Sequence, residues 1–334
     1  MIKKNFFQIK KIKKIVFFGF NPNLENFFNI NKKNNIESFI FTSTNQFKQL
    51  SKFKNIKNFK IIKNLDGNFR KYIKKNFNID QTLFISLSSR WIFKKNTINF
   101  LKKNLINIHS SRLPNDRGGA TISWQIMRGD RFHCQSIHLV DDGVDTGPVI
   151  FQKVSVYPKN CQIPLDCENF DLEKLNYLYE EFLSKLIKKK KLRLSYQNES
   201  LSYYNPRLNT EKDAWIDWGM NYIEIYRFIN AFDDPYAGAK TLVNNKIVSL
   251  KSVHLHSGEM FGHKFMSGII FRKDSNWVLV KISDSHNLII EKVLDKKGRN
   301  IISELKVGDR FFSNMKMIEK SKLVRTRYNQ SGLK

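Results

Sequence analysis

The sequence predicts an α/β chain in which a Rossmann-like, mostly parallel sheet domain is followed by a smaller, OB-like β-barrel domain. Residues 12–190 alternate short apolar runs with segments of helical spacing, which is typical of a parallel sheet covered on both faces. Residues 211–330 change to one helix and several short strand-like runs, which favours a small barrel. The length of 334 residues also exceeds what a single core normally holds. Residues 191–210 lack apolar periodicity and are expected to link the two domains.

In the first domain, runs rich in β-branched and aromatic residues predict strands at 14–20, 36–44, 58–65, 82–87, 105–109 and 135–140. Segments with apolar residues at helical spacing predict helices at 21–33, 67–77, 94–104, 118–130 and 171–192. In the second domain the pattern predicts a helix at 216–232 and strands within 239–245, 246–255, 267–282 and 286–294. Ligands of parallel sheets bind at the carboxyl ends of the strands, so the residues that follow 105–109 are of most interest.

The net charge and the cysteines of the chain bear on its partners and its location. The chain has 58 Lys and Arg against 30 Asp and Glu, a net charge of +28 that suits a polyanionic partner. However, Lys, Asn, Ile and Phe are all over-used together along the whole chain, so we favour compositional drift as the cause of the charge and keep a polyanionic partner as the alternative. Cys134, Cys161 and Cys167 have neither metal-type nor paired spacing, which favours a reducing, cytoplasmic location without a metal site.

No apolar run reaches the roughly 20 residues that cross a bilayer, so no membrane partner is expected. The first 14 residues are basic, with scattered apolar residues and no small-residue cleavage pattern. We expect a frayed or edge segment there and not a signal peptide.

One polar stretch, "NIHSSRLPNDRGG" at 107–119, differs from the rest of the chain, in which Lys, Asn, Ile and Phe predominate. Asn107 and His109 are two positions apart on a predicted strand, so their side chains point to the same side. The next predicted strand is followed by "DDGVDTG" at 141–147, and we expect both polar ends at one edge, where His109 and Asp145 can meet. An Asn amide can stabilise an oxyanion, a His can move a proton, and a carboxylate can raise the His pKa. Together they suit attack of an amine on an activated acyl or formyl carbon.

Each of these residues taken singly also fits a purely structural role. His109 alone fits a structural histidine at a strand end, and Asp and Gly are common in turns for local reasons. The Asp spacing lacks the distal Glu of an EF-hand. The chain has no Gly-x-Ser-x-Gly, phosphate-loop or Gly-x-Gly-x-x-Gly signature, which disfavours a serine hydrolase and nucleotide redox chemistry.

Taken together, the two motifs resemble those of the formyltransferases that use 10-formyltetrahydrofolate, which carry Asn-x-His-x-Ser-x-Leu-Pro and Asp-x-Gly-x-Asp-Thr-Gly in this order. Residues from "YYNPRLNTEKDAW" to Val248 also resemble the start of the carboxy-terminal domain of these enzymes. The resemblance implies that Asn107 and His109 flank the formyl carbon and that Asp145 tunes His109. It further implies a pterin site and a substrate loop. The implied pterin contacts are Ser89, Arg90, Trp91 and Ile92 with the turn residues Asp142, Gly143 and Val144. The implied substrate loop contains Ser111, Leu113 and Pro114, with Arg117 and Gly118 bordering the acceptor.

The acceptor amine is not fixed by these motifs. The segment after the second strand lacks the Gly, Pro and Arg signature of the insertion found in methionyl-tRNA formyltransferases, and "FDDPYAGAKT" is closer to the amino-sugar enzymes. Both features favour a nucleotide-linked amino sugar, which is the acceptor that we expect from the sequence. The charge of +28 favours tRNA, which makes methionyl-tRNA the alternative acceptor. A non-catalytic, basic RNA-binding protein on the same scaffold is the alternative from another class. A homodimer through the barrel is also possible.

Overall fold

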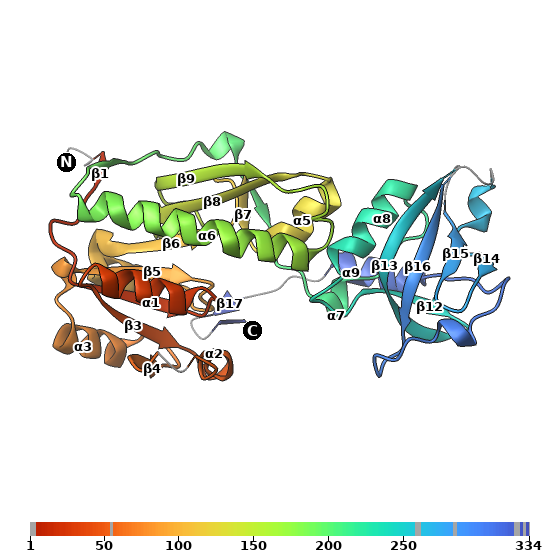
Figure 1. The fold of residues 1–334 in the computed structure, drawn as a ribbon, viewed down its shortest axis with the longest axis horizontal. Coiled ribbons are helices and arrows are strands. Elements are labelled where there is room, and N and C mark those ends of the chain that lie inside the picture. The colour runs from red at the N-terminus through yellow and green to blue at the C-terminus, as the bar shows by residue number, and fades with distance from the viewer. Residues whose placement is uncertain are drawn as a thin grey trace.

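The computed structural model describes residues 5–53, 56–257, 262–282 and 286–323, together with the short strands β17 (Tyr328–Asn329) and β18 (Gly332–Leu333). Residues 1–4 of the predicted edge segment, and residues 324–327 and 330 of the predicted second domain, lie outside the described residues. Figure 1 shows an amino-terminal part built on a large sheet, with a carboxy-terminal part beside it. Over the described ranges, no helix has both the length and the apolar character needed to cross a membrane.

The large sheet contains seven strands within the described residues, in the order β4-β3-β2-β5-β6-β8-β9. In Figure 1 it runs from β9 at the top to β4 at the bottom. Neighbours from β4 to β6 are parallel, whereas β8 is antiparallel to β6 and β9 is antiparallel to β8. A mostly parallel sheet is therefore confirmed. The strands are β2 (Lys14–Gly19), β3 (Glu37–Thr42), β4 (Phe59–Ile61), β5 (Thr82–Leu87), β6 (Leu105–His109), β8 (Phe132–Leu139) and β9 (Val149–Val156).

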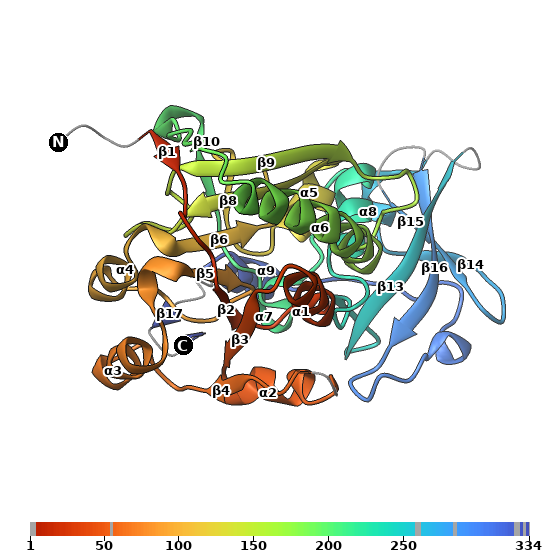
Figure 2. The same ribbon diagram turned by 60° about the vertical axis from the view of Figure 1, so that its left-hand side comes forward.

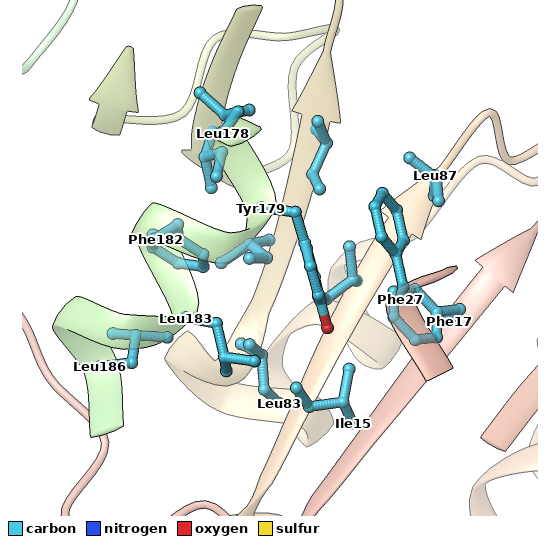
Figure 3. Packing of buried hydrophobic residues seen from close by; sticks show 14 of the residues in the cluster. Ile15, Phe17, Phe27, Leu83, Leu87, Leu178, Tyr179, Phe182, Leu183 and Leu186 are labelled. Atoms are coloured by element: carbon cyan, nitrogen blue, oxygen red, sulfur yellow. The ribbon is translucent and has the colours of Figure 1, made fainter. Parts of the chain in front are cut away.

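Helices cover both faces of this sheet, as Figure 2 shows. One face packs against α1 (Leu24–Lys33) and α6 (Pro164–Ile187), and the other against α3 (Gly67–Asn76) and α4 (Lys95–Leu101). In Figure 3, Tyr179 of α6 lies among Phe27 of α1 and residues of the central strands. Its ring centroid is 4.1 Å from that of Phe27, and its hydroxyl donates to Asn31 Oδ1 at 2.8 Å. The buried hydroxyl thus has a partner, which removes the cost of placing it in the core.

Several helix ends follow from local sequence. The Asp66 side chain accepts from the Phe69 amide at the start of α3, and Pro164 occupies the first turn of α6, where its missing N–H costs nothing. The predicted start of α6 at residue 171 was therefore too late. Helix α2 (Thr44–Leu50), which was not predicted, begins at Ser43, whose side chain accepts from the Gln46 amide.

Residues 191–210 are structured. Strand β10 (Leu192–Arg193) pairs with β1 (Phe6–Phe7) in a separate two-stranded sheet, so part of the predicted frayed or edge segment forms a short strand. Strand β11 (Tyr203–Asn205) pairs in parallel with β7 (Asp116–Gly118), which precedes α5 (Thr121–Arg128). Helix α7 (Thr210–Asp213) then leads into the second part.

The second part contains an antiparallel sheet of five strands within the described residues, in the order β12-β13-β16-β15-β14. Residues 309–312 hydrogen-bond to both edge strands, through Leu242 of β12 and Ile270 of β14. An antiparallel β domain is confirmed, and closure into a barrel stays a prediction. The elements are α8 (Tyr222–Ala231), β12 (Ala239–Val243), β13 (Lys246–Ser257), β14 (Ile270–Lys273), β15 (Val278–Lys281), β16 (His286–Leu294) and α9 (Met315–Lys322).

Contacts between α5 and α8 join the two parts. Ser123 Oγ donates to the Ala231 carbonyl at 2.9 Å, and both residues are buried. The Leu165 amide at the start of α6 donates to the Asp234 carbonyl at 2.8 Å. The second part therefore packs against α5 and the start of α6.

Candidate active site

The side chains on one face of the sheet change from apolar to polar along the strands. Phe84 of β5 and Leu105 of β6 are paired and buried in the core under α3 and α4. Two residues further on, Ser86 is paired with Asn107, and Asn107 is paired with His138 of β8. Side chains alternate along a strand, so these polar groups share the face of Phe84 and Leu105. The sheet thus presents a polar floor directly beside a hydrophobic core.

Asp145 reaches this floor by a route that the sequence did not predict. Because β8 is antiparallel to β6, its carboxyl end lies beside the start of β6, where the Val140 amide donates to the Leu105 carbonyl at 3.1 Å. The expectation that both strands end at one edge was therefore wrong. The expected meeting with His109 still occurs, because the loop between β8 and β9 folds back over the polar floor. Asp145 Oδ2 lies 3.7 Å from His109 Nε2.

The Asp145 carboxylate is the centre of the site. It accepts hydrogen bonds from the Gly118 amide at 3.0 Å and from Asn107 Nδ2 at 3.2 Å, and its Oδ1 lies 3.4 Å from His138 Nε2. Burial alone would raise the pKa of this carboxyl. The neighbouring His109, the contact with His138 and the Gly118 amide outweigh burial and hold the pKa of Asp145 well below its usual range. Asp145 is therefore ionised at any working pH.

The proton positions on the two histidines follow from their carbonyl partners. His109 Nε2 lies 3.0 Å from the Asp116 carbonyl oxygen, which can only accept, so Nε2 carries a hydrogen. When His109 is neutral, Nδ1 is the atom left to take up a proton. His138 Nδ1 likewise donates to the Leu139 carbonyl at 2.8 Å, which leaves its Nε2 to accept from Asn107 Nδ2 at 3.1 Å when the ring is neutral.

His138 was missed by the sequence reasoning, although a signal was present. In the segment from Ser136 to Leu139, polar and apolar residues alternate, and His138 falls on the same side of its strand as Ser136. This alternation places the ring on one face of a strand that ends in the "DDGVDTG" motif.

A pocket of about 390 Å³ opens over the polar floor. It is lined by all three predicted catalytic residues and by every residue that the resemblance assigned to the pterin, namely Ser89, Arg90, Trp91, Ile92, Asp142, Gly143 and Val144. Trp91 is held in place by a hydrogen bond from its Nε1 to the Lys63 carbonyl at 3.1 Å. Tyr204 and Arg207, from the segment that joins the two parts, also line the pocket and were not predicted.

Of the two residues expected to border the acceptor, Gly118 lines this pocket and Arg117 does not, which corrects the expectation for Arg117. Ser111 is fully buried and donates to the Asp116 carbonyl, and the Arg117 side chain is 6% exposed because its guanidinium binds Gln197 and Glu199. Leu113 and Pro114 instead line a separate cavity of about 440 Å³. The role of Ser111, Leu113 and Pro114 in shaping the loop stays a prediction.

The chain matches two models of known families. Residues 13–162 match "Formyl transferase" and residues 209–306 match "Formyl transferase, C-terminal domain". A methionyl-tRNA formyltransferase of Dictyoglomus turgidum is 31% identical over 217 residues, which cover 62% of this chain and 66% of that protein, just under two thirds of its length. A methionyl-tRNA formyltransferase of Prochlorococcus marinus is 29% identical over 248 residues, covering 68% and 71%.

Among solved structures, the fold is similar to that of an N-formyltransferase from Helicobacter canadensis in complex with folinic acid and dTDP-3-aminofucose. The TM-score is 0.66 with 20% identity, over 84% of this chain and 99% of that chain. This similarity shows a shared fold. With matching models for both parts of the chain and the Asn107, His109 and Asp145 motifs assembled at one pocket, the protein belongs to the formyl transferase family.

Proposed function

We propose that this protein transfers a formyl group from 10-formyltetrahydrofolate to a primary amine. The observation that carries the proposal is the assembly of Asn107, His109 and His138 around one ionised carboxylate, that of Asp145, at the floor of a pocket. Acyl transfer to an amine requires a group that takes the amine proton and a group that stabilises the oxyanion. Both types are present, and no residue has to be acylated.

The pocket walls suit the folate donor. A pterin is flat and has hydrogen-bonding edges, and the pocket offers apolar surface from Trp91, Ile92 and Val144 beside the polar main chain of two loops. Small-molecule sites commonly combine apolar walls with a few fixed polar groups in this way. The donor would supply an activated formyl carbon above Asn107 and His109.

His109 is the proposed proton carrier. The amine nitrogen bonds to the formyl carbon and loses a proton, while the bond from that carbon to the leaving nitrogen breaks and the leaving nitrogen gains a proton. Nδ1 of a neutral His109 can hold the proton between these events. The resulting imidazolium is stabilised by Asp145, 3.7 Å from Nε2, and by the Asp116 carbonyl. The positive charge of this imidazolium also stabilises the oxyanion that develops on the formyl oxygen.

Asn107 is oriented by its partners. Its Nδ2 group lies 3.2 Å from Asp145 and 3.1 Å from His138, so a developing oxyanion competes with these two groups for the amide hydrogens. Protonation of His138 Nε2 would release one of them. We therefore place Asn107 as oxyanion donor with His138 as the group that frees its N–H.

For the acceptor we propose methionyl-tRNA. Both curated relatives described above carry this activity in their names, and the net charge of +28 suits a polyanion. Helix α2 follows the second strand and is tied to the pocket wall by the hydrogen bond from Gln46 Nε2 to the Ser88 carbonyl at 3.2 Å. Exposed lysines surround this rim, at positions 48, 52, 63 and 94. Exposed lysines on this side of the pocket can contact phosphates.

A nucleotide-linked amino sugar is the second candidate, because the segment after the second strand lacks the signature of the tRNA enzymes. The "FDDPYAGAKT" segment does not line the pocket, and its Asp233 and Asp234 contact Lys251 and the Ser252 amide within the second part. These residues fix the second part of the fold and do not report on the acceptor.

The acceptor is tested by incubating the protein with labelled 10-formyltetrahydrofolate and either initiator methionyl-tRNA or a panel of amino-sugar nucleotides. We expect labelled formylmethionyl-tRNA, with kcat/KM falling steeply as salt rises. Formylation of a sugar alone, with weak salt dependence, would select the second candidate. Binding of tRNA that is insensitive to His109→Ala, with no transfer to any amine, would instead indicate a non-catalytic RNA-binding protein.

A further inference from the structure

Asp145 occupies a backbone conformation that needs external support. Its φ is +55°, in the left-handed region that non-glycine residues rarely adopt. The turn is also pressed closely against β8, because a Cβ on Gly147 would lie 1.7 Å from the Leu139 carbonyl oxygen. A strained turn persists only where surrounding contacts hold it in place.

The main chain of this turn is held by Gln197, some fifty positions further along the chain. Gln197 Nε2 donates to the Asp145 carbonyl at 2.8 Å and to the Gly147 carbonyl at 2.6 Å. One amide group thereby binds the carbonyls on both sides of Thr146. The Asp145 side chain is held separately, by the Gly118 amide and Asn107.

Gln197 is oriented in turn by Arg117. Gln197 Oε1 accepts from Arg117 Nε at 3.1 Å and Nη2 at 3.0 Å. With donors on one side and carbonyl acceptors on the other, only one orientation of the Gln197 amide satisfies all four contacts. The Arg117 guanidinium is buried and also binds both carboxylate oxygens of Glu199, at 2.8 Å and 3.0 Å. Its place is set by β7, which pairs with β11.

Arg117 and Gly118 therefore hold Asp145 from two directions. The Gly118 amide binds the carboxylate directly, and Arg117 acts on the backbone through Gln197. We propose that Gln197 and Arg117 are positioning residues of the active site, which fix the turn that presents Asp145 to His109. The segment between the two parts of the fold thereby becomes a component of the catalytic apparatus. This inference rests on the proposed function of the site.

The test is the variant Gln197→Glu, which is nearly isosteric. Its carboxylate still accepts from Arg117, so the protein should stay folded, with Tm lowered by about 4–8 °C because the two hydrogen bonds to the turn are lost. It replaces the N–H donor by an oxygen that faces two carbonyl oxygens, so the turn should open. Gln197→Met, which lacks both polar groups, is the second variant. Gln162→Glu is the matched control, because Gln162 also donates to a carbonyl, that of Lys159, and accepts from the Tyr226 hydroxyl, but contacts no residue of the turn.

Two readouts separate positioning from general stability. Amide hydrogen exchange of residues 141–147 should accelerate about tenfold in both Gln197 variants and stay unchanged in Gln162→Glu. The kcat for formyl transfer should fall about 100-fold, as expected for a misplaced catalytic group, whereas KM for the folate, which borders the same turn, should rise by no more than about tenfold. Wild-type exchange in the turn, or wild-type kcat despite faster exchange, would overturn the assignment. If the wild type and Gln162→Glu transfer no formyl group while the exchange responds as expected, the proposed function is wrong. The role of Gln197 in holding the turn that carries Asp145 is then retained.

Discussion

Replacing Asp145 with Asn removes one negative charge from the centre of the site and keeps the size of the side chain. The carboxylate accepts from the Gly118 amide and from Asn107 Nδ2, and it faces two histidines. Hydrogen bonds to charged groups contribute about 1.5–3 kcal/mol each. The new amide can still accept one of the two bonds but turns its own NH₂ toward the other donor. We therefore expect a loss of about 2–4 kcal/mol when His109 carries a proton, which is about 30-fold to 900-fold in kcat.

The assay is single-turnover formyl transfer at saturating 10-formyltetrahydrofolate, with folate affinity measured separately by fluorescence. Asp80→Asn is the control, because Asp80 is an exposed carboxylate that contacts Lys102 on the surface. It should behave as the wild type. A rate for Asp145→Asn within about threefold of the wild type would refute the electrostatic reasoning, since the charge would then be contributing less than about 0.7 kcal/mol.

Further predictions concern stability, the folate wall and the loop around Gly118. Because the folded-state pKa of Asp145 lies below its unfolded value near 3.9, its ionised form stabilises the fold above about pH 4, and this contribution is lost as the pH falls towards the folded pKa. Urea unfolding should therefore show the largest difference between the wild type and Asp145→Asn near neutral pH, and an equal difference at pH 3 and pH 7 would contradict this. Val144→Asp places a charge on an exposed pocket wall and should weaken folate affinity about tenfold without lowering Tm, as measured by titration. Gly118→Ala should cost about 1–3 kcal/mol of unfolding free energy and reduce kcat, because φ is +97° there and the new Cβ would lie 2.2 Å from the Asn205 carbonyl oxygen. Wild-type stability of this variant would show that the loop can relax.

The strands of the parallel sheet could be predicted because their apolar runs are short, β-branched and separated by helical patterns. The direction of β8 could not be predicted from the sequence. A strand followed by a polar turn looks the same in sequence whether it lies parallel or antiparallel to its neighbour, and only the pairing with β6 shows which. Helix α2 was missed because it is a single short segment whose two apolar residues, Phe47 and Leu50, are too few to show a helical period.

The core of the site could be predicted because Asn107, His109 and Asp145 lie in two local motifs. The residues outside these motifs that hold or line the site could not be predicted. Gln197, Tyr204 and Arg207 come from a segment without periodicity, and they reach the site only because β11 pairs with β7. For the same reason Arg117, an arginine in a polar loop, was expected to face the acceptor, whereas the fold buries it against residues some eighty positions away.

The most direct test of the central claim is single-turnover transfer of a labelled formyl group from 10-formyltetrahydrofolate to methionyl-tRNA, by the wild type and by His109→Ala. We expect formylmethionyl-tRNA from the wild type and a rate at least about 100-fold lower from the variant, with folate binding retained. Transfer by His109→Ala at the wild-type rate, or no transfer to any amine by the wild type, would contradict it.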